Sequence, residues 1–144
     1  MFSFYLKRAA PDDFKYIYLI NSRLFGDKCQ SELKSRLIFE DIINNNKNIF
    51  LTVNHGNRVA GYAYAAEIFS MSFGHYAEVI DFITLEYYRS KGADEYLLRA
   101  VEQWASQTLC SEIRFCADDK IKEDLLKRLA YMKDENSQIY RKQL

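Results

Sequence analysis

The sequence predicts an α/β domain with a mixed sheet, in the element order β-α-α-β-β-β-α-β-α-β. Short β-rich apolar runs alternate with longer stretches in which apolar residues recur at helical spacing. The length of 144 residues allows a sizeable core within one domain. The single Pro lies near the start, and no Pro/Gly/Ser-rich linker or repeat divides the chain, so we expect one domain over residues 1–144.

The first predicted elements are a short strand and a helix. Apolar and polar residues alternate over residues 2–7, the period of a half-buried strand. Apolar residues then recur at helical spacing from Phe14 to Phe25. Pro11 suits the first turn of this helix, and Gly26 suits its end.

A second helix and a hairpin are expected next. Apolar residues at helical spacing predict the helix from about Ser31 to Ile42. Residues 49–53 and 59–66 are β-rich, and the turn-forming residues 55–57 join them into a hairpin. Residues 69–75 have no regular pattern, which predicts an irregular loop.

Strands and helices alternate in the remainder of the chain. Residues 77–85 form an apolar strand interrupted by Glu78 and Asp81. The remaining expected elements are a helix from Asp94 to Ala105, a strand from Glu112 to Cys116, a helix from Lys120 to Leu129 and a closing strand from Gln138 to Lys142.

Charge and hydropathy limit the class of partner. The 20 Lys and Arg residues balance the 20 Asp and Glu residues. Nonspecific affinity for nucleic acid comes from neutralising phosphates, so zero net charge argues against nucleic acid as the main partner. A local basic patch can still hold one phosphorylated small molecule. No signal-peptide pattern and no apolar run of membrane-spanning length occurs, so we expect no membrane partner.

Cysteine and histidine usage predicts a reduced compartment and no metal ion. Cys29, Cys110 and Cys116 are odd in number and contain no C-x-x-C pair, and the two histidines are His55 and His75. These spacings match no zinc-binding pattern. We therefore expect a cytoplasmic protein without a metal cofactor.

The segment with the clearest chemical meaning is a strand that enters a basic turn and then an amphipathic helix. The turn contains Arg89, Lys91 and Gly92. Backbone N–H groups at a helix start are unpaired within the helix and face whatever precedes it. Glycine allows close approach of an anion, and the two basic residues add positive charge. The turn therefore predicts a phosphate-binding site, although such turns also occur in domains that bind no anion.

This turn resembles the R/Q-x-x-G-x-G/A pyrophosphate loop of the GNAT superfamily of N-acetyltransferases. Residues 88–92, YRSKG, resemble the YRGKG found in that family. Residues 97–105, LLRAVEQWA, are similar to its LLxAVExWA. The element order agrees over nearly the whole chain, so the sequence resembles a bacterial, single-domain GNAT protein with the fold of that family.

The resemblance implies acetyl-CoA as co-substrate and a primary amine as acceptor. The diphosphate is expected on the backbone amides of the basic turn, and the pantetheine arm is expected along the end of the preceding strand. A backbone N–H there would polarise the acetyl carbonyl, and the amine would attack the thioester directly. The acetyl-CoA-binding residues that this implies are Phe82, Ile83, Thr84, Arg89, Ser90, Lys91, Gly92, Ala93, Asp94 and Glu95.

Three positions depart from the family pattern. Asp94 stands where Gly or Ala is usual, and its carboxylate would either cap the helix start or repel the diphosphate. Ala130 stands where Gly is usual, a change that we expect to affect packing alone. Leu126 stands where many members have a Tyr that protonates the departing thiolate, which leaves Tyr131 and Tyr140 as candidates for that role.

A carboxylate is expected to act as the base on the acceptor amine, which must lose a proton before it attacks. Glu78 is the first candidate, because partial burial at the start of an apolar strand would raise its pKa. Its alternative is a solvated strand end. Asp81 is the second candidate, with a hydrogen-bonding role as its alternative, and Glu67 is the third. A chain of water molecules can replace a single base.

The acceptor is expected to be a small cationic molecule. Residues 25–42 and 69–75 would shape its pocket, and they are aromatic and mildly acidic. Residues 102–112 resemble those of aminoglycoside 6′-N-acetyltransferases. Two other functions remain open: a catalytically weak acyl-CoA-binding or regulatory module, and a protein or peptide acetyltransferase. A homodimer is plausible from the family resemblance.

Overall fold

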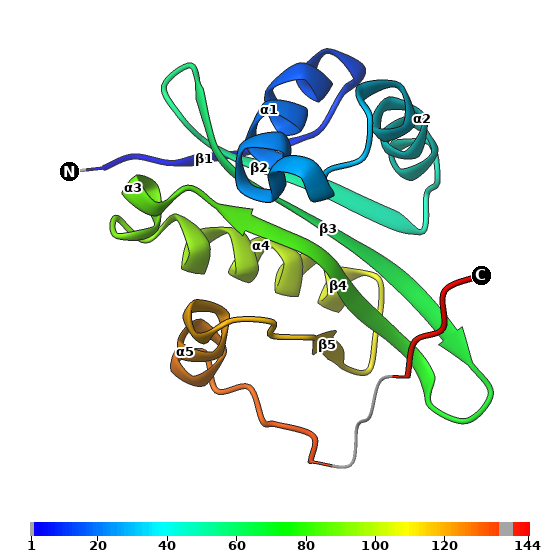
Figure 1. The fold of residues 1–144 in the computed structure, drawn as a ribbon. Helices are drawn as coiled ribbons and strands as arrows, with labels where there is room; N and C mark the ends of the chain where they lie inside the picture. Colours follow the sequence, from blue (N-terminus) through cyan, green and yellow to red (C-terminus); the bar gives the residue numbers. More distant parts are fainter. Residues whose placement is uncertain (1, 136–139) are drawn as a thin grey trace.

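The structure is a computed structural model that describes residues 2–135 and 140–144. Figure 1 shows a sheet with α1 and α2 on one face and α4 and α5 on the other. The elements are β1 (Tyr5–Arg8), α1 (Phe14–Phe25), α2 (Glu32–Ile43), β2 (Asn48–His55), β3 (Arg58–Ser70), β4 (Gly74–Thr84), α3 (Glu86–Arg89), α4 (Ala93–Gln107), β5 (Ile113–Phe115) and α5 (Lys120–Arg128). Short 3-10 turns, Pro11–Asp13 and Gly26–Lys28, flank α1.

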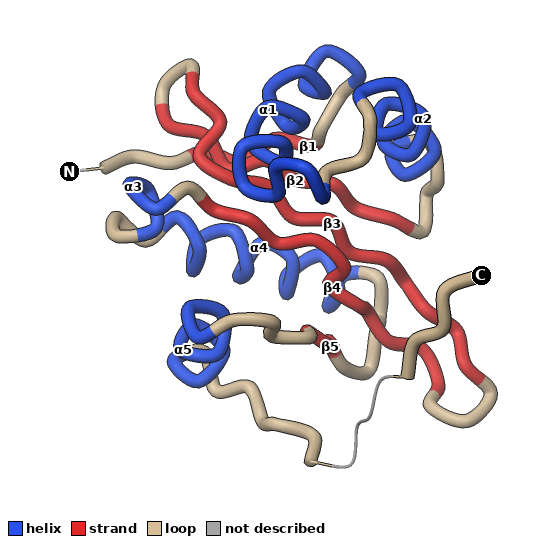
Figure 2. The backbone as a smooth tube through the Cα atoms, in the orientation of Figure 1, coloured by secondary structure: helices blue, strands red, loops and turns tan. Residues whose placement is uncertain are grey.

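The sheet is mixed, as predicted, with strand order β1-β2-β3-β4-β5. Strands β1 to β4 are antiparallel, whereas β5 runs parallel to β4 (Figure 2). Strand β4 pairs with β5 through three residues, Ala77, Glu78 and Val79. Beyond them the pairing ends. Strand β4 also contains a bulge, because Val79 and Asp81 pair with consecutive residues of β3 and leave Ile80 without a partner.

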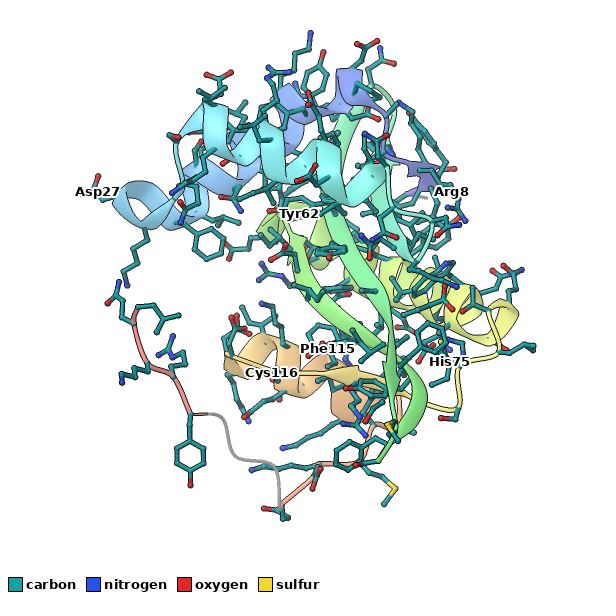
Figure 3. The ribbon with its side chains drawn as sticks, turned by 90° about the vertical axis from the view of Figure 1, so that its right-hand side faces the viewer. Arg8, Asp27, Tyr62, His75, Phe115 and Cys116 are labelled. Carbon is teal, nitrogen blue, oxygen red and sulfur yellow. The ribbon has the colours of Figure 1, made fainter. Side chains whose placement is uncertain are left out.

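Each face of the sheet has its own core. On the face of α1 and α2, the core is largely aromatic and includes Phe14, Ile17, Ile20, Phe39, Phe50, Tyr62 and Ile83. On the other face, β2 to β4 pack against α4 and α5 through aliphatic residues that include Val53, Ala63, Val79, Leu97, Leu98, Val101 and Leu125. Figure 3 shows Tyr62 below the helix pair and Phe115 on the side of α5. This burial on both faces explains why most strand segments lack strict alternation.

The hairpin of β3 and β4 is longer than the sequence predicted. The irregular loop expected over residues 69–75 is wrong, because β3 continues to Ser70 and β4 begins at Gly74. A cross-strand pair stabilises this extension: the rings of Phe69 and His75 stack with centroids 4.3 Å apart. Three residues remain for the turn, so residues 69–75 form a hairpin tip.

The C-terminal part differs from expectation in two further ways. Residues 138 and 139 of the expected closing strand lie outside the described residues, and residues 140–144 form no strand. The described sheet therefore has five strands. The basic turn also contains a short helix, α3, that apolar periodicity did not predict, because one turn of helix is too short to show a period.

Ala130 affects the backbone as well as the packing, which corrects the sequence-based expectation. Its φ is +65°, in the left-handed region that favours glycine. It follows the last turn of α5 in a Schellman motif, in which the Tyr131 N–H donates to the Leu126 carbonyl at 2.9 Å and the Ala130 N–H donates to that of Lys127 at 3.2 Å. Alanine in place of glycine therefore strains the backbone at this position.

Strand β3 approaches the end of β4 closely at Gly61. Gly61 pairs with Thr84. A Cβ atom on Gly61 would lie 2.5 Å from the Ile83 carbonyl oxygen and 2.9 Å from Cγ2 of Thr84. Glycine is therefore required here, and the close approach fixes the position of Ile83 and Thr84. None of the helices in the described residues has the length and hydropathy needed to cross a membrane.

Candidate active site between the diverging strands

The divergence of β4 from β5 opens one edge of the sheet. Phe82, Ile83 and Thr84 pair with β3 on one side and have no β5 partner within the described chain. A cavity of about 210 Å³ lies beside them. Its walls come from β4, the end of α1 and the starts of α4 and α5: Leu24, Phe25, Phe82, Ile83, Thr84, Arg89, Asp94, Asp118, Asp119, Ile121, Lys122 and Leu125. An extended ligand can therefore reach the free edge of β4 as an added strand would.

Within the described chain, the start of α4 has unpaired backbone donors beside the same cavity, whose lining includes Asp94. Gly92 precedes the helix with φ +94°, a left-handed conformation that glycine adopts without strain. The amides of residues 89–92 donate to carbonyls of the preceding turn. In the described structure, the amides of Ala93 and Asp94 have no hydrogen-bond acceptor. The predicted set of anion-binding amides therefore narrows to these two, where the positive end of the helix dipole lies.

The two basic residues of the turn point to different places. The Arg89 guanidinium lines the cavity and donates to the Thr84 carbonyl at 2.9 Å. The Lys91 ammonium instead lies 5.3 Å from the centroid of the Phe2 ring. Arg89 therefore joins the end of β4 to the helix start, whereas Lys91 lies outside the cavity.

Asp94 lies in the first turn of α4. From the sequence, its carboxylate was expected either to cap the helix start or to repel the diphosphate, and the structure shows features of both. Its side chain is buried and also lines the cavity. Oδ1 accepts the N–H of Glu95 at 2.7 Å, and Oδ2 lies 3.5 Å from the guanidinium of Arg128. The carboxylate therefore satisfies one N–H of the helix start, although Gly92 is the N-cap. It also removes the Glu95 amide from the donors open to a ligand.

Glu78 and Asp81 lie on the face of the sheet covered by α1 and α2. Their antiparallel partners are Ala66 and Tyr64, and directly paired residues share a face. Tyr64 packs against the aromatic core of that face. In a regular strand, residues three positions apart point to opposite faces. The bulge at Ile80 puts Glu78 and Asp81 on the same face of the sheet.

Both carboxylates are exposed. Even so, desolvation by the surrounding protein raises the pKa of Asp81 above its ordinary value, while the positive charge of Lys122 acts in the opposite direction. Glu78 is exposed, so the partial burial expected for it is not found. Glu67 lies on the opposite face with its partner Ala77, and it accepts a hydrogen bond from His75 at 2.8 Å.

The position equivalent to the family tyrosine is part of the core. Leu126 is buried against β4 and α4. The Tyr131 hydroxyl donates to Glu102 at 2.8 Å, and burial together with this bond raises its pKa. Tyr140 is exposed in the C-terminal segment. Neither tyrosine lines the cavity between the strands.

Lys122 is a cavity residue that the sequence analysis missed. Its Nζ donates to Asp118 at 2.8 Å, and its charge acts on Asp81. A signal was present in the sequence: Lys122 begins the i, i+3, i+4, i+7 stripe that continues with Leu125, Leu126 and Leu129. A lysine in the apolar stripe of a helix faces the sheet rather than solvent, and its side chain is 20% exposed.

A second and more open hollow of about 710 Å³ lies between the N-terminal segment, the β2–β3 turn and α3. Its lining residues are Phe2, His55, Asn57, Arg58, Tyr87 and Tyr88. It lies away from the diverging strands. Neither Glu78 nor Asp81 lines either hollow, but Asp81 directly precedes Phe82 in the wall of the cavity beside β4. The cavity beside β4 is therefore the better candidate active site, although it is smaller.

Comparison with known proteins identifies the family of the chain. Residues 14–131 match the family described as Acetyltransferase (GNAT) family. No curated protein sequence matches the chain significantly.

Solved structures share the fold over nearly the whole chain. The aminoglycoside antibiotic 6′-N-acetyltransferase AAC(6′)-Ih from Acinetobacter baumannii is similar with TM-score 0.81 at 16% identity, over 99% of both chains. AAC(6′)-Iy in complex with the bisubstrate analogue CoA-S-monomethyl-acetylneamine gives 0.84 at 14% identity, also over 99% of both. An aminoglycoside acetyltransferase from an uncultured soil metagenomic sample, in complex with sisomicin, gives 0.83 at 16% identity over 98% of this chain and 96% of its own.

Proposed function

Since the chain belongs to the GNAT family of acetyltransferases, we propose that it moves the acetyl group of acetyl-CoA to a primary amine of a small cationic molecule. The observation that carries this proposal is the divergence of β4 and β5 beside the amides at the start of α4 that are unpaired within the described residues. One edge of β4 and one helix start then face the same cavity. An anionic head and an extended arm are the two parts of a ligand that such a cavity fits.

The residues fit acetyl-CoA as follows. The amides of Ala93 and Asp94 donate to the diphosphate at the positive end of α4, and Arg89 adds a charge at the rim. The free edge of residues 82–84 hydrogen-bonds the pantetheine arm. Acetyl-CoA supplies an activated thioester, so the protein needs no nucleophile of its own.

The remaining task of the protein is to handle one proton on each side of the reaction. The incoming ammonium loses a proton to Asp81, directly or through water, and the free amine attacks the acetyl carbon. The C–N bond forms as the C–S bond breaks, and the sulfur takes the bonding electron pair. The nitrogen then loses a second proton to solvent, which leaves the neutral amide. What supports Asp81 over Glu78 is its place next to Phe82 in the cavity wall together with its raised pKa, because a higher pKa makes a carboxylate a better proton acceptor. Glu78 is then placed to attract the cationic acceptor.

Lys122 is our candidate for the group that balances charge on the departing sulfur. It lines the cavity with Phe82 and Ile83, whereas the position of the family tyrosine is filled by Leu126. An ammonium near a developing thiolate lowers its energy, and solvent or the ammonium then supplies the proton.

A cationic acceptor suits the charges on the face of α1 and α2. Glu78 and Asp81 are both acidic, and Tyr64 offers an aromatic surface beside them. The similar solved structures are described as aminoglycoside acetyltransferases. We therefore propose aminoglycosides and other polyamines as the first acceptors to test. A cytoplasmic location and a homodimer stay predictions.

The test is release of the CoA thiol from acetyl-CoA in the presence of single amines. The expected result is turnover with at least one polycationic amine and none with its N-acetylated or carboxylate analogue. The buried carboxylate of Asp94 in the cavity wall favours one other function, a weakly active acyl-CoA-binding module. Tight acetyl-CoA binding without turnover on any amine would support that function and contradict ours.

A further inference from the structure

A second cluster of reactive side chains lies at the other end of β4, where β4 and β5 are paired. Glu67 comes from β3, His75 from β4 and Cys110 from the loop after α4 (Figure 3 labels His75 near the hairpin tip). Their ligand atoms all lie within 4.8 Å of one another. His75 Nε2 lies 2.8 Å from Glu67 Oε1 and 3.6 Å from Cys110 Sγ.

From this arrangement we propose that Glu67, His75 and Cys110 form a zinc-binding site. One nitrogen of His75 contacts both other side chains. In a Cys-His-acid catalytic set, the imidazole uses one nitrogen for the thiol and the other for the acid. Here the three donor atoms instead converge on one point, as the ligands of a single metal ion do.

The donor set selects zinc over the hard divalent cations. A thiolate and an imidazole favour Zn²⁺, whereas Mg²⁺ and Ca²⁺ prefer oxygen ligands. With metal–ligand bonds of roughly 2.0–2.3 Å, tetrahedral geometry sets the donor atoms about 3.3–3.8 Å apart. The Cys110–His75 distance already lies in that range, and the Glu67–His75 pair needs to open by about half an ångström.

The charges also balance. The Glu67 carboxylate and a Cys110 thiolate together neutralise Zn²⁺, while the His75 imidazole binds as the neutral ligand. Binding displaces the Cys110 thiol proton to solvent, and no electron is transferred. The Glu67 side chain is only 8% exposed, so its negative charge gains more from a bound cation than an exposed carboxylate would.

The backbone holds the three ligands together before any ion binds. Leu109 has φ +65° in a Schellman motif, in which the Cys110 N–H donates to the Ala105 carbonyl at 3.0 Å. Ser111 then donates from its amide at 2.8 Å, and from its hydroxyl at 2.9 Å, to the His75 carbonyl. Leu109 is strained and lies next to Cys110, and two hydrogen bonds from Ser111 hold the loop to His75. A metal site needs ligands that are held in place in this way.

The site joins the hairpin tip to the loop before β5, so zinc would stabilise the paired end of the two strands. It lies on the face of α4, opposite Glu78 and Asp81. The sequence predicted no metal because the three ligands are far apart in the chain: His75 and Cys110 are separated by 35 positions. This proposal is independent of the proposed acetyl transfer.

The first experiment uses the intact chain and its three cysteines. Metal-stripped protein is treated with iodoacetamide with and without Zn²⁺, and alkylation is followed at each cysteine by mass spectrometry. Because a metal-bound thiolate is a weaker nucleophile, zinc should slow alkylation of Cys110 by about tenfold or more. Cys29 and Cys116 are internal controls whose rates should not change.

The second experiment replaces zinc with Co²⁺, whose thiolate complexes absorb through charge transfer from sulfur to metal. One cobalt ion per chain is expected, with this band lost in Cys110→Ser and in His75→Gln. The matched controls Cys116→Ser and His55→Gln should retain it. Equal alkylation of Cys110 with and without zinc, or a charge-transfer band that survives in Cys110→Ser, would overturn the proposal.

Discussion

The two ends of β4 differ in how many neighbouring strands pair with their backbone. At the paired end, Ala77 to Val79 bond to β3 on one side and to β5 on the other. At the open end, Phe82 to Thr84 pair with β3 alone and border a cavity. A single bulged residue, Ile80, separates the two ends. The same strand thus closes the fold at one end and offers unpaired backbone to a ligand at the other.

The carboxylates follow the same division. Both are exposed, but Glu78 lies at the paired end, whereas Asp81 lies past the bulge, where desolvation by the surrounding protein raises its pKa. Only the bulge puts both on one face, because their spacing would otherwise send them to opposite faces. We therefore assign the proposed chemistry to the open end, and the predictions below test that assignment.

Neutralising the two carboxylates one at a time should give the largest difference in turnover number between a variant and its control. Asp81→Asn removes the proposed base and should lower the turnover number for acetyl transfer about 100- to 1000-fold. Glu78→Gln, the matched control, should lower it less than about tenfold and chiefly raise the KM of a cationic acceptor. Rates of CoA thiol release measure both. Equal losses in the two variants would contradict the assignment of the base to Asp81, and a larger loss in Glu78→Gln would place the base at the paired end.

The pH dependence of the rate is a second test of the assignment of the base to Asp81. The Asp81 carboxyl must be ionised to accept a proton, so the wild-type rate should fall as pH falls through its raised pKa. The sign for stability is opposite. A raised folded-state pKa means that the native state binds more protons, so stability declines as pH rises through that window.

Asp81→Asn should therefore raise the melting temperature at neutral pH, and the gain should shrink as pH is lowered towards the ordinary pKa of Asp. Melting scans of wild type and variant across pH measure it. A variant less stable than wild type at neutral pH would contradict a raised pKa of Asp81 in the folded state.

Gly61→Ala should disturb the open end specifically. The added Cβ meets the backbone of Ile83 and Thr84, so either β3 or the end of β4 must shift. The free energy of unfolding should fall by about 1–3 kcal/mol, measured by urea titration. The affinity for acetyl-CoA should fall with it, because residues 83 and 84 border the cavity. Unchanged stability would show that the strand ends are looser than the structure indicates.

Replacing Lys122 should have a smaller effect, on the turnover number. Lys122→Gln removes the charge beside the cavity and should lower the turnover number about tenfold, a loss of roughly 1.4 kcal/mol in transition-state stabilisation. Lys120→Gln, on the same helix but outside the cavity lining, is the control. If both variants kept the wild-type rate, the charge on the departing sulfur would be balanced elsewhere.

The smallest expected effect is a gain in stability. Ala130→Gly relieves the left-handed backbone after α5 and should raise the free energy of unfolding by about 0.5–1 kcal/mol. The residue lies outside the cavity, so acetyl-CoA affinity should not change. A loss of stability would mean that the Ala130 methyl group packs more favourably than its backbone is strained.

Sequence patterns predicted most of the elements because their causes are local. The stripe Leu97, Leu98, Val101 and Trp104 indicated α4, and the turn chemistry at residues 55–57 indicated the first hairpin. The bulge at Ile80 depends on the register between two strands, which local patterns do not contain.

The candidate site divides in the same way. The basic turn before α4 was predictable, because its glycine and charges are adjacent in the chain. The distinct directions of Arg89 and Lys91, the contact of Asp94 with Arg128 and the cluster around His75 were not. Each depends on a partner that only the folded chain brings near.

The central claim is that the open end of β4 and the start of α4 bind acetyl-CoA. Thermal unfolding of the wild-type chain with increasing acetyl-CoA tests it most directly, because a ligand that binds only the native state stabilises it. At 100 times the dissociation constant the account predicts about 2.7 kcal/mol of added stability and a rise of several degrees in the melting temperature. An unchanged melting temperature at saturating acetyl-CoA would contradict it.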